Sequence, residues 1–203
     1  MNHIEAYSDG SGNSSDKPGG YGWVLVVNGQ KVSEGNGHLE NASNNDCELR
    51  GAIEALKAAY VYGVKENKDS IGLSCNVTLV SDSQIILNWA NGSYRFKQLD
   101  KMNQYDMLRA LMLNMKADTR WVKGHSGDKY NERCDRLANA ARLGTEVGTP
   151  KKRKNRIGKR QKGVFLFTFN GKKKIVDLIL NKCEDYSEEE HGERSAIAHL
   201  KEE

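Results

Sequence analysis

The fold is decided by residues 4–34, which read IEAYSDGSGNSSDKPGGYGWVLVVNGQKVSE. Residues 4–8 have the alternating pattern of a strand, and two further strand patterns, over residues 21–27 and 31–34, flank Asn28 and Gly29. An Asn-Gly pair between two strands is a strong signal for a two-residue hairpin turn. The sequence therefore predicts three antiparallel strands at the start of the chain.

Helix and strand patterns alternate after this hairpin. Helical spacing over residues 47–60 places Leu49, Ile53, Leu56 and Ala59 on one face. The later elements are a buried strand over 77–80, a helix ending near Trp89, an amphipathic helix over 99–115, a strand over 119–122 and a helix over 130–143. This order predicts an α/β fold with a mixed five-stranded sheet, in which parallel strands follow the antiparallel ones and helices cover both faces.

Composition excludes several classes of protein. No stretch is apolar and long enough to span a bilayer, and the N-terminus, MNHIEAYSDG, lacks the basic and then apolar pattern of a signal peptide. The four cysteines show no paired C-x-x-C spacing, which argues against a zinc site and a disulfide framework. We therefore expect an intracellular, cytoplasmic protein with reduced thiols and no membrane association.

Four acidic residues stand in distinctive local contexts. They are Asp9 in SDGSG, Glu48 in NNDCELRGAIEAL, Asp82 in LVSDSQ and Asp135 in NERCDRLANAA. Carboxylates are hard oxygen ligands suited to Mg²⁺ or Mn²⁺, and a cluster of them is costly unless cations lie between them. The pattern predicts a metal site for cutting nucleic acid, whereas an isolated Asp in such a chain is usually a surface or capping residue.

Five motifs occur in an order that resembles the type 1 ribonuclease H family. They are DGSG with the Gly-rich turn and strand that follow it, NN-x-x-EL, SDSQ, WVKGHSG and NE-x-CD-x-LAN, and together they run from about Ile4 to Leu143. The resemblance implies an RNase H-like fold. It also implies an endoribonuclease that hydrolyses the RNA strand of RNA–DNA hybrids and leaves 5′-phosphate and 3′-hydroxyl ends.

The resemblance also assigns roles to the acidic residues. It implies two Mg²⁺ ions, for which Mn²⁺ can substitute. Asp9 would bridge the two ions, Glu48 and Asp82 would complete the shell of one, and Asp135 would complete the shell of the other. His125, in the Gly-flanked loop KGHSGD, would serve proton transfer or product release beside the ions. A lone His is more often structural or solvated.

A second set of residues is expected to choose the substrate. Asn44, Asn45 and Gln84 are neutral hydrogen-bonding side chains beside the acids, and the resemblance implies that they read the 2′-hydroxyls and minor-groove edges of the RNA strand. Helix capping is the alternative for the two asparagines. Ser43 and Ser15 fall where the family holds a phosphate of the DNA strand, although Asn is more typical at the position of Ser15.

The chain departs from many bacterial family members in one interval. Those members insert a Lys- and Trp-rich protrusion that grips the hybrid, whereas residues 90–98 here hold only Arg95 and Lys97 as basic residues. Positive charge lies in the tail instead. Residues 1–150 hold 17 Lys and Arg against 18 Asp and Glu, and residues 151–203 hold 14 against 9.

The basic residues of the tail are concentrated in one short stretch, which we expect to attract nucleic-acid phosphates. They are Lys151, Lys152, Arg153, Lys154, Arg156, Lys159, Arg160 and Lys162. The segment PKKRK also resembles a nuclear localisation signal, and a solvated linker is the alternative for either function. We predict an RNase H catalytic domain over residues 1–144, a basic linker over 145–162 and a small extension over 163–203.

The extension is expected to form a β-hairpin from residues 164–169 and 174–180, followed by a helix over residues 187–201. A piece of this size seldom folds alone, so we expect it to dock on the catalytic domain or on a protein partner. We expect a monomer that binds an RNA–DNA hybrid. The alternative function is a non-catalytic hybrid-binding scaffold, and integrases, transposases and resolvases rank lower because they lack the NN-x-x-EL and KGHSG segments.

Overall fold

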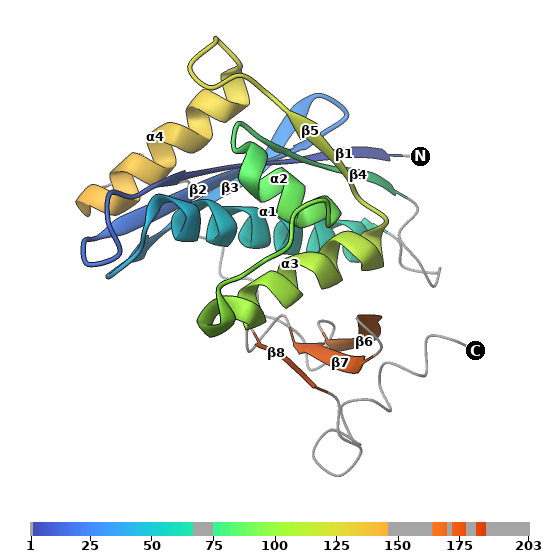
Figure 1. Ribbon diagram of the computed structural model, residues 1–203. Helices are drawn as coiled ribbons and strands as arrows, with labels where there is room; N and C mark the ends of the chain where they lie inside the picture. The colour runs from blue at the N-terminus through green and yellow to red at the C-terminus, as the bar shows by residue number, and fades with distance from the viewer. Residues whose placement is uncertain (1, 67–74, 146–163, 170–171, 178–181, 186–203) are drawn as a thin grey trace. The chain divides into compact units, whose positions relative to one another are not determined.

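The computed structural model describes residues 2–66, 75–145, 164–169, 172–177 and 182–185. The chain divides into two compact units, Met1–Val147 and Gly148–Glu203. The first unit contains a five-stranded sheet with helices, and the second contains a three-stranded sheet (Figure 1).

The sheet of the first unit has the strand order β3-β2-β1-β4-β5. Three strands, β1 (Asn2–Ser11), β2 (Gly19–Val27) and β3 (Gln30–Leu39), pair antiparallel in sequence order. Strand β4 (Cys75–Ser81) pairs parallel with β1, and β5 (Asp118–Trp121) pairs parallel with β4. The predicted mixed sheet is therefore confirmed.

The turn between β2 and β3 is the predicted two-residue hairpin. Asn28 has φ 50° and Gly29 has φ 80°, so both central residues lie in the left-handed region. Such a turn matches the right-handed twist of the flanking strands, and Asn and Gly are the residues that tolerate it best. The turn brings Val27 opposite Gln30 and fixes the register of the pair.

Helices cover both faces of this sheet, as predicted. Figure 1 shows α4 (Lys129–Leu143) on one side of it, and α1 (Asn44–Glu66) with α3 (Met102–Met115) on the other. Two neighbouring glycines of β2 show how close these helices lie. A Cβ added to Gly19 would overlap Cys47 of α1, and a Cβ added to Gly20 would overlap the backbone of α4.

The core on the α1 side follows the predicted stripe. Leu49, Ile53, Leu56 and Ala59 are all at most 1% exposed. Helix α1 is longer at both ends than the pattern over residues 47–60 indicated, because the stripe marks only the buried turns. The helix predicted over residues 99–115 begins with a 3-10 turn, η1 (Leu99–Lys101), before α3 starts at Met102.

The shortened interval after α2 (Gln84–Asn91) is closed by an aromatic cluster. Phe96 is buried, contacts Trp89 edge-on with ring centroids 4.9 Å apart, and stacks on Tyr105 with centroids 4.8 Å apart. Arg95 and Lys97, on either side of Phe96, are exposed. The interval is thus a compact connection between α2 and α3.

The second unit contains β6 (Val164–Phe169), β7 (Lys172–Asp177) and β8 (Lys182–Asp185), which pair antiparallel in that order. The pairing of β6 with β7 agrees with the predicted hairpin, although β7 ends three residues earlier than expected. Strand β8 was not predicted, because KCED has no apolar alternation. The predicted helix over 187–201 and the basic stretch over 151–162 lie outside the described residues.

Within the described ranges, no helix combines the length and the apolar character needed to cross a membrane. Cys47, Cys75 and Cys134 are buried and form no disulfide within the described residues.

Candidate active site

The four acidic residues come from two neighbouring strands and from helices on opposite faces of the sheet. Asp9 lies in β1, and Asp82 directly follows β4, the parallel neighbour of β1. Glu48 belongs to α1 and Asp135 to α4. Two details differ from the sequence predictions: β1 continues for two residues beyond Asp9, and Glu48 is the fifth residue of its helix because α1 begins at Asn44.

Asp9 is at the electrostatic centre of this group. Its side chain is buried, with the residue 8% exposed, and its Oδ1 accepts a 2.7 Å hydrogen bond from the Gly10 amide. The pKa of Asp9 is raised to about 8, mainly by burial and then by the negative charges of Asp82, Glu48 and Asp135, while the hydrogen bond from Gly10 opposes the rise. Asp82, Glu48 and Asp135 therefore lie near enough to Asp9 for their charges to act on its carboxyl group.

Glu48 is also buried, and burial followed by the charge of Asp82 raises its pKa, while hydrogen bonding to Ser83 and Asn44 lowers it. Asn44 Nδ2 donates to Glu48 Oε1 at 2.5 Å. The other oxygen, Oε2, is buried and has no well-aligned hydrogen-bond partner among the described residues, although the Ser83 hydroxyl is near. A buried carboxylate oxygen without a donor is costly unless another ligand reaches it.

Asp82 is held by groups from two other segments. Asn131, a buried residue of α4, donates from Nδ2 to Asp82 Oδ2 at 3.0 Å. Trp121 Nε1 donates to the Asp82 carbonyl oxygen at 3.0 Å. A Cβ on Gly124 would lie 2.7 Å from Asp82 Oδ2, so only glycine leaves this carboxylate its space.

Asn131 is a site residue that the sequence analysis missed. It stands four residues before Asp135, so both residues lie on the same face of α4, and it is the Asn of the NE-x-CD motif. That helical spacing was the available signal. What the spacing does not reveal is that the partner of Asn131 is Asp82, 49 residues away in the chain.

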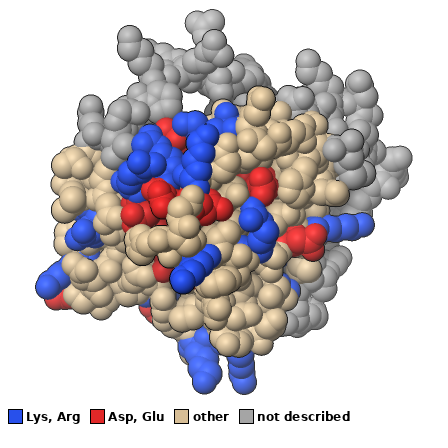
Figure 2. Space-filling view, turned by 90° about the horizontal axis from the view of Figure 1, so that it is seen from above, with Lys and Arg blue, Asp and Glu red and all other residues tan. Residues whose placement is uncertain are grey.

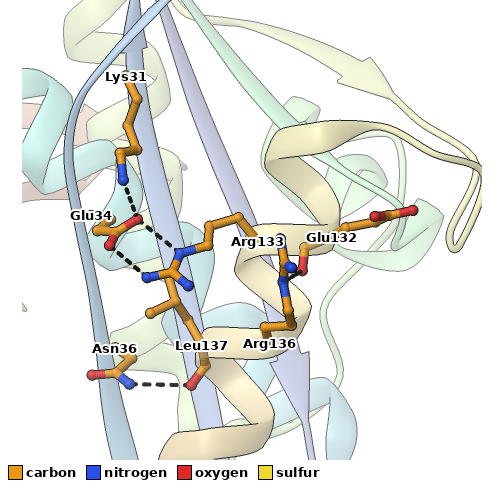
Figure 3. Close-up of polar contacts among 7 residues, drawn as sticks. All are labelled: Lys31, Glu34, Asn36, Glu132, Arg133, Arg136 and Leu137. Atoms are coloured by element: carbon orange, nitrogen blue, oxygen red, sulfur yellow. Dashed lines mark hydrogen bonds and ion pairs between the residues drawn. The ribbon is translucent and has the colours of Figure 1, made fainter. Parts of the chain in front are cut away.

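Helix α4 is fixed to the edge strand β3 by polar contacts (Figure 3). Arg133 donates to both oxygens of Glu34, with Nε to Oε2 at 3.0 Å and Nη2 to Oε1 at 2.8 Å. Lys31 also binds Glu34, and Asn36 donates to the Leu137 carbonyl at 3.2 Å. These contacts hold the helix that carries Asp135 in one position over the sheet.

His125 lies in the loop between β5 and α4, where the sequence analysis placed it. The residue is exposed and has φ 51°, a left-handed conformation between Gly124 and Gly127. Because Gly124 packs against Asp82, the loop touches the acidic group directly. Asp128 ends the loop as the N-cap of α4, and it accepts hydrogen bonds from the Tyr130 and Asn131 amides.

The residues expected to choose the substrate cluster partly at the start of α1. Ser43 caps this helix: its carbonyl accepts from the Asp46 and Cys47 amides, and its hydroxyl donates to Asp46 Oδ2 at 2.7 Å. Asn44 therefore does not cap the helix and instead links Glu48 to the Gly12 amide. The capping alternative does not hold for Asn44, because several adjacent residues are equally good caps and Ser43 takes that place.

The remaining predicted residues are placed as follows. Asn45 is half-buried in the first turn of α1. Gln84 is exposed as the first residue of α2, two residues after Asp82, and Ser15 is exposed in the turn between β1 and β2.

The donor set suits a divalent cation. Within the described residues, no group of three or more His, Cys, Asp or Glu side chains is already drawn together as a complete metal site. The raised pKa of Asp9 and the unpartnered Oε2 of Glu48 are nevertheless the features that a bound cation would relieve. On the face seen in Figure 2, acidic side chains gather near the middle, with Lys and Arg side chains next to them.

Comparisons with known proteins identify the family of this chain. The model of the RNase H family matches residues 1–142. Ribonuclease H of Pseudoalteromonas atlantica is 36% identical over 160 residues, covering 72% of this chain and 95% of that protein. Ribonuclease H of Sulfurovum is 36% identical over 141 residues, covering 66% of this chain and 87% of that protein.

Solved structures give the same fold. RNase H1 of Halobacterium salinarum is 29% identical with a TM-score of 0.56, covering 68% of this chain and 96% of that one. LC11-RNase H1, solved in complex with an RNA/DNA hybrid, is 21% identical with a TM-score of 0.58, covering 70% of this chain and 97% of that one. The chain belongs to the RNase H family and is a type 1 ribonuclease H.

Proposed function

We propose that this enzyme is an endonuclease that hydrolyses the RNA strand of RNA–DNA hybrids with two Mg²⁺ ions, for which Mn²⁺ substitutes. The products would carry 5′-phosphate and 3′-hydroxyl ends. The observation that carries the proposal is the convergence on Asp9, whose pKa is raised by burial and by Asp82, Glu48 and Asp135. The relative solved with an RNA/DNA hybrid supports the choice of substrate.

The four carboxylates, Asp9, Glu48, Asp82 and Asp135, would hold the ions. When bound there, divalent ions would supply activation of a water molecule as nucleophile and stabilisation of the leaving oxygen. The protein's part is to fix the ligands. Asn131 and Gly124 orient Asp82, and Asn44 binds Oε1 of Glu48, which leaves the buried Oε2 as the oxygen available to a cation.

His125 would move a proton near the leaving oxygen or assist product release. Its exposure and its position in a glycine-flanked loop leave it free to approach the scissile phosphate. Because the carboxylates do the main work, we expect His125 to aid catalysis without being essential.

Asn44, Asn45 and Gln84 would contact the RNA strand, since they lie next to Glu48 and Asp82 and present amide groups that can read 2′-hydroxyls. Ser43 and Ser15 would contact a phosphate of the DNA strand. The Ser43 hydroxyl already donates to Asp46, so a contact with the phosphate would require the hydroxyl to rotate and donate to a phosphate oxygen instead.

The basic stretch of the tail would bind the phosphates of the hybrid electrostatically, a role for which the shortened interval at residues 90–98 has few basic residues. In the full chain, replacing its eight Lys and Arg residues by Gln should weaken hybrid binding and reduce its salt dependence, because each phosphate contact releases counterions. An unchanged affinity and salt slope would contradict this role. Docking of the extension, a cytoplasmic location and a monomeric state stay predictions.

The proposed activity is tested by offering a labelled RNA–DNA hybrid beside double-stranded RNA, double-stranded DNA and single-stranded RNA, with Mg²⁺ and with EDTA. Cleavage confined to the RNA of the hybrid is the expected result. Cleavage of another substrate would contradict the proposed specificity. Binding of the hybrid without cleavage would favour the scaffold alternative.

A further inference from the structure

Four polar side chains of β1 and α4 form a continuous hydrogen-bond chain that ends on Asp135. Arg142 Nε donates to Ser11 Oγ at 2.9 Å, and Ser11 Oγ donates to Asn139 Oδ1 at 2.8 Å. Asn139 Nδ2 then donates to Asp135 Oδ1 at 2.7 Å and to the Asp135 carbonyl at 3.0 Å. Arg142 Nη2 makes a longer contact of 3.4 Å with Asn139 Oδ1. All four residues are half-buried.

The chemistry of the two ends fixes the direction of this chain. A guanidinium can only donate hydrogen bonds, and an ionised carboxylate can only accept them. The Asn139 amide must therefore turn its nitrogen towards Asp135, which leaves its oxygen for Ser11 and Arg142. Opposite charges at the two ends polarise the hydrogen bonds between them and strengthen each one.

This hydrogen-bond chain also links the two elements, β1 and α4, that carry Asp9 and Asp135. Ser11 is two residues after Asp9 in β1, so the two side chains lie on the same face of the strand. That face is the one covered by α4, because a Cβ on the intervening Gly10 would overlap Glu48 of α1 on the other face. Ser11 thus ties the strand of Asp9 to the helix of Asp135.

We propose that Asn139 is a positioning residue for Asp135, held in turn by Ser11 and Arg142. Asn139 occupies Oδ1 and turns the carboxylate so that Oδ2 is the oxygen without a hydrogen bond in the described part of the chain. Without this contact, Asp135 would have to be ordered by the incoming cation itself. The inference rests on the proposed function, since it concerns how Asp135 meets a divalent ion.

Binding of Mn²⁺ alone to the full chain, measured by calorimetry without nucleic acid, tests the proposal. Asn139→Ala should raise the dissociation constant for Mn²⁺ by about 10-fold, the usual effect of losing a hydrogen bond that orients a ligand. Ser11→Ala should raise it by a smaller factor. The double variant should bind no more weakly than Asn139→Ala, because both residues act through one contact. In cleavage, kcat should fall while KM for the hybrid is unchanged.

Two matched variants separate positioning from general damage. Asn103→Ala removes an exposed Asn from α3 and should leave Mn²⁺ binding unchanged. Ser11→Thr keeps the hydroxyl and should bind Mn²⁺ as the native chain does. If Asn139→Ala binds Mn²⁺ with native affinity, or if Asn103→Ala loses as much, the inference is wrong while the proposed function stands. If the native chain binds no Mn²⁺, both are wrong.

Discussion

Arg133 of α4 donates two hydrogen bonds to Glu34 of β3, from Nε to Oε2 at 3.0 Å and from Nη2 to Oε1 at 2.8 Å. Arg133 is two residues before Asp135, and Glu34 belongs to the strand at the edge of the sheet. The Glu34 side chain is 4% exposed and the Arg133 side chain 23%, so the carboxylate is shielded from water while the guanidinium is partly exposed. The contact therefore joins the edge of the sheet to the helix that completes the acidic site.

Loss of this pair should destabilise the protein in a pH-dependent way. Hydrogen bonding to Arg133 lowers the pKa of Glu34 from 4.5 to about 2, against the effect of burial. The stabilisation is thus present above about pH 4.5 and is lost as the pH falls towards 2. At pH 7, Glu34→Gln should lower the free energy of unfolding by about 2 kcal/mol in urea denaturation.

The control for this variant is Glu40→Gln, which changes an exposed Glu that follows β3. It should lower the free energy of unfolding by less than about 0.5 kcal/mol. A difference between the native chain and Glu34→Gln that stays constant down to pH 2 would show that the ion pair is not the cause.

Substitution of Asp9 should stabilise the protein in the absence of metal while abolishing cleavage. The pKa of Asp9 is raised from 3.8 to about 8, so between these pH values the folded protein keeps a proton that the unfolded chain has released. The free energy of unfolding therefore falls as the pH rises through this range. At pH 8 in EDTA, Asp9→Asn should unfold with a free energy about 2 kcal/mol higher than the native chain.

Divalent cations should favour the native chain over Asp9→Asn in stability, the reverse of the order expected in EDTA. Mg²⁺ should raise the melting temperature of the native chain and leave Asp9→Asn unchanged, because only the native site gains a ligand for the cation. If Mg²⁺ raises the melting temperature of both proteins equally, the cation binds at a site that does not include Asp9.

Metal binding should also release protons. Because Asp9 holds a proton below about pH 8, a cation that binds its carboxylate must displace that proton. Mn²⁺ affinity should therefore rise with pH up to about 8 and level off above it. Calorimetry in two buffers of different ionisation enthalpy measures the protons released at pH 7. Binding without proton release at that pH would contradict the raised pKa.

A methyl group at position 124 should disturb the site without unfolding the protein. The Cβ of Gly124→Ala would lie 2.7 Å from Asp82 Oδ2, so the carboxylate must move away from its contact with Asn131. Displacement of a catalytic group by about 1 Å commonly costs up to 100-fold in rate, so kcat should fall by about 10-fold or more. Ser126→Ala in the same loop is the control, and an equal loss there would point to the loop rather than to Asp82.

The start of α1 should depend on a pair that reaches across the chain. Lys101 of η1 donates to Asp46 Oδ1 at 2.5 Å, while Ser43 binds the other oxygen. Burial raises the pKa of Asp46, but these hydrogen bonds outweigh it and leave the pKa lowered. Asp46→Ala should lower the free energy of unfolding by about 1 to 2 kcal/mol, since it removes both the reciprocal cap and the ion pair. Lys101→Met removes only the ion pair. If Lys101→Met lowers the free energy of unfolding as much as Asp46→Ala does, the contact between Asp46 and Ser43 does not stabilise the helix.

The sequence predicted those parts of the molecule that depend on local patterns. Asn28 and Gly29 fixed a hairpin because few other residues accept positive φ at both turn positions. The acidic residues were found because each stands in a motif. The N-cap of α1 could not be assigned from the sequence because Ser43, Asn44 and Asn45 are nearly equal as caps, and only the fold decides among them.

Contacts between residues that are distant in the sequence could not be predicted from local patterns. Ser11 and Asn139 are 128 residues apart, and Arg133 and Glu34 are 99 apart. Each pair forms because α4 packs closely on the sheet. The glycines of β2 permit this close packing, and no local sequence pattern specifies which residues it brings together. Residues that orient the acids were therefore harder to predict than the acids themselves.

The central claim, that the acids around Asp9 hold the ions that hydrolyse RNA in a hybrid, is tested most directly by single-turnover cleavage of an end-labelled hybrid. The native chain should cut only the RNA strand in Mg²⁺ and leave 5′-phosphate ends. Asp9→Asn should bind the same hybrid without cutting it. Cleavage by Asp9→Asn, or cleavage by the native chain in EDTA, would contradict the account.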